Sequence, residues 1–445
     1  MQIKLSEKFD YKKLLAFTLP SIVMMLFSSI YGVIDGLFVS NFAGDVPFKA
    51  INLIFPFIMI MATVGFMFGS GGTAIVASTY GEGDEQKANE YFSLFVYVTF
   101  ALGVICAVVS FFLMRPIAIL LGAEGQILDD CVLYGRVLMC SLPFSVLQFL
   151  FQSFFVGAEK PRIGLAVIIS AGVTNILLDA LLVTLLPQEY KLLGAALATA
   201  FGQVVGGGVP LIYFFRKNSS FLRLGKTKFN FRIILKACAN GSSEFMSNVA
   251  MNLVGMLYNY QLIKYADYDG VAAYGVMMYV SFIFASIFIG YSIGVAPIIS
   301  YNDGAKNHEE KKSVFKKSLL IIGVGSLIAT LLAEVLAYPL SSIFVGSNPD
   351  LLKMTEYGFR IFSVSFLFMG GAIFASSFFT ALNDGLTSAI ISFLRTLVFQ
   401  LVAVFTMPLI FGGIDGIWWS VVVAEFSAVV LSVAFLIFKR KKYNY

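Results

Sequence analysis

The sequence predicts an all-α integral membrane protein with about twelve transmembrane helices, arranged as two pseudo-symmetric six-helix lobes around a central cleft. An apolar composition, regularly spaced apolar runs and an internal repeat all lead to this fold class. Of the 445 residues, 58% are hydrophobic and only 13% are charged. A soluble domain needs more charge to cover its surface, whereas lipid solvates an apolar outer face.

The apolar runs are long enough to cross a bilayer, since one span needs about 20 apolar residues. In the first half they cover residues 14–40, 48–79, 91–114, 131–156, 162–186 and 192–215. In the second half they cover residues 233–264, 270–301, 316–338, 354–380, 386–411 and 414–438. The first two runs of each half exceed a perpendicular span, so they must tilt, kink or protrude. Pro20 is a candidate hinge in the first run, and Pro56 is a kink site in the second.

Lysine and arginine gather in alternate loops, which sets the orientation. They cluster in residues 4–13, 216–232, 306–317 and 439–442, whereas the opposite loops are acidic or nearly neutral. We therefore expect a multi-pass protein of the cell membrane with both termini cytoplasmic. The polar N-terminus leads into an apolar run too long for the core of a signal peptide, so no cleavable signal peptide is expected.

The two halves resemble each other. Tyr80-Gly-Glu-Gly ends the second run and Tyr301-Asn-Asp-Gly ends the eighth. Because this shift covers an even number of spans, the repeats are parallel, and a substrate cavity is expected between lobes that rock for alternating access. The predicted parts are an N-lobe (1–215), a cytoplasmic linker (216–232) and a C-lobe (233–445).

Signatures of other function classes are missing from the sequence. It has one histidine, His308, and neither a Walker A motif nor HExxH, so neither an enzyme nor a bound cofactor is expected. No stretch could form a nucleotide-binding domain, so transport is expected to be secondary. The basic residues lie in loops between apolar runs, so no nucleic-acid partner is expected. Phe68-Gly-Ser-Gly-Gly-Thr lies inside an apolar run, where close helix packing is the expected role.

Ionisable residues inside spans are the informative ones, because each costs about 3 kcal/mol at mid-helix. Asp35 lies in the first run, Asp179 lies in the fifth, and Asn175 precedes Asp179 by one helical turn on the same face. Thr199 lies in the sixth run at a similar distance from the same end. Oxygen ligands suit a hard cation such as Na+, and a carboxylate pair in an apolar lobe can instead bind H+. The alternative is that Asp35 and Asp179 only hydrogen-bond between helices.

Other polar groups inside spans are weaker candidates. Glu244, Asn248 and Asn252 follow one face of the seventh run and form a candidate second cation or substrate site, although Glu244 could equally face water at the cytoplasmic end. Gln148 and Gln152 are candidates for the substrate cleft, and Arg395 could pair with a carboxylate. For Glu334 and Glu425 a structural role is favoured.

These motifs together resemble the MATE (multidrug and toxic compound extrusion) family, and within it the bacterial MepA-like branch. The residues that carry the resemblance are Leu19-Pro-Ser, Tyr31-Gly-Val-Ile-Asp-Gly-Leu-Phe-Val, Thr174-Asn-Ile-Leu-Leu-Asp and Gly194-Ala-Ala-Leu-Ala-Thr. The similarity extends over essentially the whole chain.

The resemblance implies an N-lobe cation site at Asp35, Asn175, Asp179 and Thr199, and a helix bent at Pro20. Glu244 is the counterpart of a C-lobe carboxylate that some members use, whereas the tenth span lacks a central aspartate and Asp384 lies in the following loop. The implied function is secondary active multidrug efflux, in which Na+ or H+ is exchanged for organic, often cationic, compounds. A monomer in the lipid bilayer is expected to suffice. The alternative is a lipid-linked oligosaccharide flippase of the same superfamily, which the scarcity of Lys and Arg inside spans disfavours.

Overall fold

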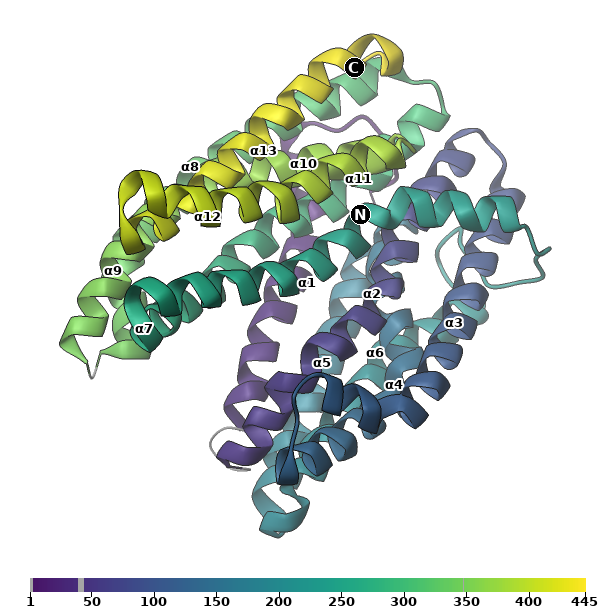
Figure 1. Ribbon diagram of the computed structural model, residues 1–445. Coiled ribbons are helices and arrows are strands. Elements are labelled where there is room, and N and C mark those ends of the chain that lie inside the picture. The colour runs from purple at the N-terminus through teal and green to yellow at the C-terminus, as the bar shows by residue number, and fades with distance from the viewer. Residues whose placement is uncertain (1–2, 39–43, 347) are drawn as a thin grey trace.

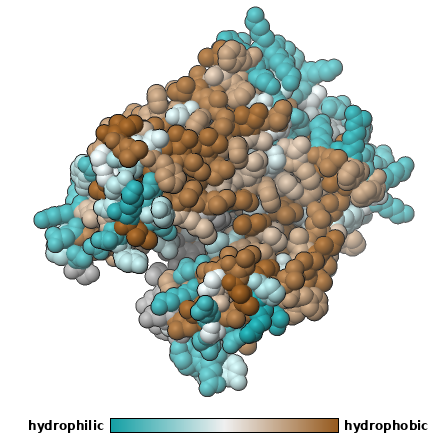
Figure 2. Space-filling model, viewed as in Figure 1, coloured by the Kyte–Doolittle hydropathy of each residue, from teal (hydrophilic) through white to brown (hydrophobic). Residues whose placement is uncertain are grey.

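In the computed structural model, residues 3–38, 44–346 and 348–445 are described. Their helices form two bundles that meet at one end and diverge toward the other (Figure 1). The space-filling view shows hydrophobic side chains along the flanks of both bundles, hydrophilic ones at the ends, and a notch where the bundles diverge (Figure 2). This distribution fits a protein whose flanks contact lipid.

The first bundle, the N-lobe, contains six long helices. They are α1 (Tyr11–Phe38), α2 (Asp45–Gly81), α3 (Glu85–Leu120), α4 (Gly125–Gly157), α5 (Pro161–Leu185) and α6 (Lys191–Phe215), with the short η2 (Gln188–Tyr190) before α6. Each matches a predicted span, but several extend further than predicted because polar caps lengthen them beyond the apolar run. At the start of α3, for example, the Asp84 side chain accepts a hydrogen bond from the Lys87 amide at 2.9 Å.

The second bundle, the C-lobe, departs from uniform spans in three places. Its elements are α7 (Phe231–Gly304), α8 (His308–Val345), α9 (Pro349–Ser363), α10 (Phe366–Ala381), α11 (Gly385–Phe393), the π-helix η3 (Leu394–Val398), α12 (Phe399–Phe411) and α13 (Gly413–Tyr443). Ala266 and Asp267 have non-helical backbone angles, so α7 is two rods. The pair α9 and α10 bends by 47°, and η3 joins α11 to α12.

Counted in this way, the described residues give the predicted number of crossings. The N-lobe contributes α1 to α6, and the C-lobe contributes the two rods of α7, α8, the bent α9–α10 pair, the α11–α12 helix and α13. Six crossings in each lobe confirm the predicted fold class of twelve helices in two lobes.

Glycines bring the two lobes into close contact at one end, called here the closed end, where the C-terminal ends of α2 and α7 meet. A Cβ added to Gly81 would lie 2.1 Å from the Tyr301 carbonyl oxygen, and one added to Gly304 would lie 2.0 Å from that of Ser78. The Tyr80 and Tyr301 rings lie 5.5 Å apart, so the tyrosines of the internal repeat meet at the lobe junction. Only glycine permits this backbone approach.

The glycine-rich motif of α2 makes a second close crossing. A Cβ on Gly71 would lie 2.2 Å from the Ala237 carbonyl oxygen, and one on Gly241 would lie 1.9 Å from that of Met67. This is the helix packing that the sequence predicted for the Phe68-Gly-Ser-Gly-Gly-Thr stretch.

Residues 3–10, the N-terminal segment, connect the lobes at the closed end. The Leu5 amide donates to Glu159 Oε1 in the N-lobe at 2.7 Å, and the Phe9 amide donates to Glu310 Oε1 in the C-lobe at 2.8 Å. The Leu5 and Phe9 side chains are buried. Because the short segment is held at one site in each lobe, it opposes separation of the lobes at this end.

Candidate transport cavity and N-lobe polar cluster

Two adjacent helices of the N-lobe bring three of the predicted cation-site residues into one region. Asn175 and Asp179 lie one turn apart on α5 and are 3% and 0% exposed. Asn175 Nδ2 donates to Thr199 Oγ1 of α6 at 3.5 Å, and the Thr199 hydroxyl donates to the Ala195 carbonyl oxygen at 3.1 Å. The cluster therefore combines a carboxylate, an amide and a hydroxyl inside the lobe.

The fourth predicted residue, Asp35, belongs to α1, and its side chain lies outside the described residues. Its helix packs directly on α5: a Cβ added to Gly172 would lie 2.5 Å from the Phe27 ring. Pro20 lies in the same helix, which remains helical through it, so its role as a hinge stays a prediction.

A cavity of about 340 Å³ lies between the lobes. Most of its wall comes from α7 and from α9 to α13 of the C-lobe, while the N-lobe contributes Met25, Ser29, Phe66, Ser70 and Ser153. The described residues of the wall include four methionines and several serines, among them Met25, Met251, Met278 and Met369 with Ser70, Ser247, Ser281 and Ser292. A polarisable, adaptable wall with scattered hydroxyls suits an organic ligand.

Among the described residues, three charged side chains line this cavity. Arg395 Nε of η3 donates to Glu425 Oε2 of α13 at 2.9 Å, and Glu244 of α7 contributes a second carboxylate. Asn248 also lines the cavity, and its Nδ2 donates to the Glu244 carbonyl oxygen at 2.8 Å. The sequence left open whether Glu244 faces a binding site or water at the cytoplasmic end, and in the structure its side chain lines the cavity. The side chain of the third member of the predicted second site, Asn252, lies outside the described residues.

The structure places Gln148 and Gln152 away from this cavity. Both belong to α4, are 4% and 3% exposed, and are absent from the cavity wall. Gln148 packs against α6, where a Cβ added to Gly206 would lie 2.4 Å from Oε1. The glycines of α6 admit this side chain into the lobe interior, a pairing that spacing along α4 alone does not reveal.

Sequence reasoning missed that Arg395 and Glu425 face the cavity. It noted that Arg395 could pair with a carboxylate but favoured a structural role for Glu425. The available signal was the occurrence of opposite charges in two neighbouring apolar runs. Such charges face a protein interior or a water-filled cavity rather than lipid.

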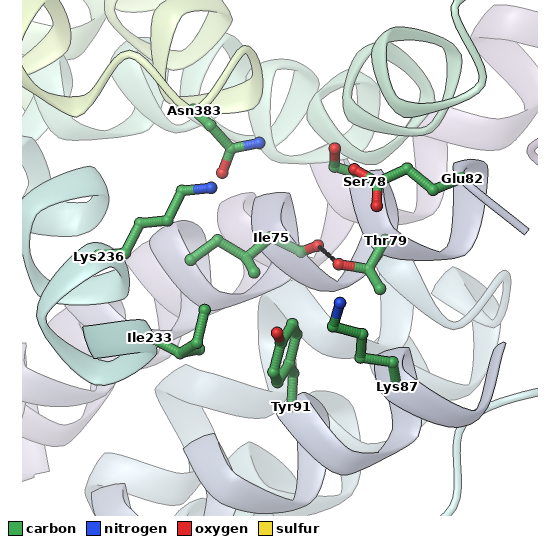
Figure 3. A pocket seen from close by; sticks show the side chains of 9 residues that line it. All are labelled: Ile75, Ser78, Thr79, Glu82, Lys87, Tyr91, Ile233, Lys236 and Asn383. Atoms are coloured by element: carbon green, nitrogen blue, oxygen red, sulfur yellow. Dashed lines mark hydrogen bonds between the residues drawn. The ribbon is translucent and has the colours of Figure 1, made fainter. Parts of the chain in front are cut away.

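A second, smaller pocket of about 140 Å³ lies at the closed end (Figure 3). Lys87 and Glu82 of the N-lobe line it together with Lys236 and Asn383 of the C-lobe. Its charges are of mixed sign, and both lobes contribute to its wall. Among the described residues, no group of three or more His, Cys, Asp or Glu side chains is placed to hold a metal ion.

Comparison with known families identifies the fold. The MatE family model matches the chain twice, at residues 20–181 and 245–406. The chain belongs to the MatE family. One match falls in each half, which confirms the internal repeat that the tyrosine motifs indicated.

Similar proteins extend over nearly the whole chain. Multidrug export protein MepA of Staphylococcus saprophyticus is 28% identical over 422 residues, which cover 93% of this chain and 91% of that protein. MepA of Staphylococcus aureus is 26% identical over 417 residues, with the same coverage. Both confirm the predicted resemblance to the MepA-like branch.

Solved structures share the arrangement of helices. A crystal structure of MATE in complex with MaL6 has a TM-score of 0.91 at 19% identity and covers 98% of this chain and 97% of that one. The outward-facing conformation of a multidrug resistance MATE family transporter of the MOP superfamily gives the same values. At this identity, the two structures support the fold alone.

Proposed function

We propose that this protein is a secondary active multidrug exporter, which exchanges Na+ or H+ for organic, often cationic, compounds by alternating access. The observation that carries the proposal is the cavity between two repeat-related lobes, with a methionine-rich wall and a carboxylate on it. Membership of the MatE family and the names of the MepA relatives support export of drugs.

The N-lobe cluster is the proposed site of the coupling cation. Asp179, Asn175 and Thr199 supply oxygen ligands on adjacent helices, and Asp35 is proposed to complete the set from α1. A cation that binds one arrangement of the lobes more tightly than the other shifts their equilibrium by that difference in affinity. One positive charge moving inward gains about 2.3 kcal/mol per 100 mV of membrane potential.

We propose that the closed end faces the cytoplasm, so that both termini are cytoplasmic and the cavity opens outward. Lys87, Lys236, Lys311 and Lys439 belong to this end, whereas the ends of the helices on the other side carry Asp129, Asp269 and Asp350. Lysine and arginine are retained on the cytoplasmic side of membrane proteins.

The proposal is tested with purified protein in liposomes, by following efflux of the organic monocation ethidium under a Na+ gradient or a pH gradient imposed separately. We expect efflux to depend on one gradient and to fall to background in Asp179→Asn and Asp35→Asn. Asp129→Asn is the matched control, because that carboxylate is 62% exposed in a surface ion pair with Arg115.

Full gradient-dependent efflux in both carboxylate variants would contradict the proposed coupling site. Absence of efflux from folded wild-type protein under either gradient would contradict export and favour a flippase for lipid-linked oligosaccharides.

A further inference from the structure

The ion pair between Arg395 and Glu425 lies in the middle of two membrane spans and on the wall of the cavity. Arg395 is ten residues beyond the start of α11 at Gly385, within the π-helix η3, and Glu425 is twelve residues into α13. Their side chains are 16% and 4% exposed. Single-turn π-helices inside an α-helix occur frequently at functional sites.

Stability alone gives a weak reason for this pair. Each charge costs about 3 kcal/mol to insert at mid-span, and buried ion pairs are often no more stabilising than apolar side chains of similar volume. The neighbouring wall of the same helices is apolar or hydroxylic, with Ser392, Thr396 and Val421 beside the pair in the cavity. Two apolar side chains would pack η3 against α13 without the cost of inserting charges, so packing alone does not explain why this pair is charged.

The guanidinium of Arg395 is open to the cavity. Within the described part of the chain its hydrogen bond runs from Nε to Glu425, and its two terminal amino groups are bonded to no described residue. These amino groups are accessible rather than enclosed, because no nitrogen of Arg395 is both buried and without a hydrogen bond, and the residue forms part of the cavity wall. A ligand in the cavity therefore meets the positive charge directly.

The charges on the wall can be counted. Among the described lining residues, the ionisable groups are Glu244, Arg395, Glu425 and the Tyr274 phenol. With both carboxylates ionised, two negative charges and one positive charge leave one net negative charge in a space of about 340 Å³. Arg395 thus cancels one carboxylate that a substrate would otherwise meet.

We propose that Arg395, held in place by Glu425, is a specificity-determining residue of the transport cavity that sets its net charge and so limits the benefit of a second positive charge on a substrate. This inference rests on the proposed export of organic cations. Removal of the guanidinium charge leaves two carboxylates and favours dications over monocations. Removal of both members of the pair returns the net charge to one negative and restores the original preference.

The test compares binding of ethidium, which has one positive charge, with binding of propidium, which has two on the same ring system. Equilibrium binding is followed by dye fluorescence at pH 8. The protein is in detergent, so no ion gradient and no transport step is involved. We expect Arg395→Gln to raise the affinity for propidium relative to ethidium by about tenfold. The affinity of each dye for a variant is divided by its affinity for the wild-type protein, so the difference in shape between the two dyes does not affect the result.

Two further variants separate charge from structure. The double variant Arg395→Gln with Glu425→Gln removes the ion pair but keeps one net negative charge, and we expect it to retain the wild-type ratio of affinities. Arg395→Lys keeps the charge on a different side chain, and it should also retain that ratio. Size-exclusion profiles establish that each variant is folded.

An unchanged ratio in Arg395→Gln, or equal changes in the single and the double variant, would overturn the inference and leave the pair with a structural role. Ethidium efflux from liposomes reports on the proposed function separately. If wild-type protein exports no ethidium but Arg395→Gln still shifts the ratio of propidium to ethidium affinity, export is contradicted and the role of Arg395 is supported. If wild-type protein exports ethidium but Arg395→Gln leaves that ratio unchanged, this inference alone is contradicted.

Discussion

At the scale of single residues, Asp384 shows how a carboxylate outside the spans stabilises the closed end. It precedes α11 and accepts hydrogen bonds from Lys439 Nζ at 3.0 Å and from the Tyr443 hydroxyl at 2.8 Å. It thereby connects the α10–α11 turn to the end of α13. Partial burial raises the pKa of the Asp384 carboxyl, but the hydrogen bonds from Lys439, Tyr443 and Thr387 together lower it more, so the pKa lies below its ordinary value.

We expect Asp384→Asn to lower the free energy of unfolding by about 1–3 kcal/mol at pH 7. Because the pKa is lower in the folded than in the unfolded protein, the ionised carboxylate stabilises the fold above about pH 4 and loses this effect as the pH falls through its folded value. The difference between the thermal unfolding midpoints of wild type and variant should therefore be smaller at about pH 3 than at pH 7. Asp269→Asn, at an exposed carboxylate, is the control. A gap of equal size at both pH values would contradict this account.

Residue by residue, the sequence is most informative where the chain itself fixes the geometry. Asn175 and Asp179 share a face because they are four residues apart on one helix, and Thr199 joins them because a short turn makes α5 and α6 neighbours. The cavity positions of Arg395 and Glu425 depend on how separate helices rotate about their axes, and apolar runs in a lipid environment specify such rotation weakly. For the same reason, spacing along α4 does not show whether Gln148 and Gln152 face the cavity, and neither forms part of its wall in this structure.

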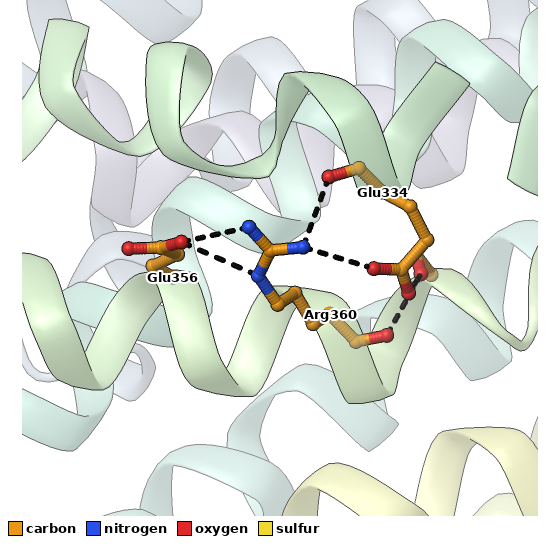
Figure 4. A network of polar contacts seen from close by, with 4 residues as sticks. Glu334, Glu356 and Arg360 are labelled. Carbon is orange, nitrogen blue, oxygen red and sulfur yellow. Dashed lines mark hydrogen bonds and ion pairs between the residues drawn. The ribbon is translucent and has the colours of Figure 1, made fainter. Parts of the chain in front are cut away.

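At the scale of elements, the lengths of the apolar runs predicted the spans, whereas breaks within them were not predicted. The bend between α9 and α10 and the π-helix η3 interrupt runs that are long and mostly apolar, and mean hydropathy reports the length of such a run but not the direction of its helix axis. Near the bend, the Ser363 hydroxyl donates to Glu334 Oε1 at 2.6 Å, and Arg360 binds both Glu334 and Glu356 (Figure 4). This network agrees with the structural role favoured for Glu334.

The crossing of α2 and α7 provides a sharper test of element packing. A Cβ at Gly241 would lie 1.9 Å from the Met67 carbonyl oxygen, and a backbone atom cannot move aside as a side chain can. We expect Gly241→Ala to separate the helices and to lower the free energy of unfolding by about 2 kcal/mol or more. The measurement is the thermal unfolding midpoint in detergent.

Gly275→Ala, in the second rod of α7, is the matched control, because its Cβ would meet nothing within 4 Å. Alanine is the better helix former by about 1 kcal/mol, so this variant should unfold at the same or a higher temperature. A similar decrease in both variants would mean that the crossing tolerates a methyl group.

At the scale of the whole molecule, the internal repeat and the two lobes were predictable because each repeat carries the same local motif. The link that the N-terminal segment forms between the lobes was not predictable, since it depends on hydrogen bonds between the segment's backbone and Glu159 of the N-lobe and Glu310 and Lys317 of the C-lobe. Glu159 Oε1 accepts from Leu5 and Glu310 Oε1 accepts from Phe9, and these carboxylates lie 151 positions apart in the chain. Any motion that separates the lobes at the closed end must break at least one of these contacts.

Phe9 is the anchor of the segment, being 1% exposed and in edge-to-face contact with Phe17 at 5.9 Å. Truncating a fully buried phenylalanine lowers stability by about 3 kcal/mol. If the segment detaches when the lobes open, the substitution destabilises only the closed arrangement. We therefore expect Phe9→Ser to raise the fraction of molecules open at this end by about tenfold or more.

The measurement is the distance between spin labels on Glu82→Cys and His308→Cys, one at the closed end of each lobe, in a chain whose four native cysteines are replaced. The unaltered segment should give one short distance, and Phe9→Ser should add a longer one. Phe229→Ser, at a side chain that is 76% exposed in the linker, should leave the distribution unchanged. If Phe9→Ser also left it unchanged, the glycine crossings would suffice to hold the lobes together, and the segment would only cover their junction.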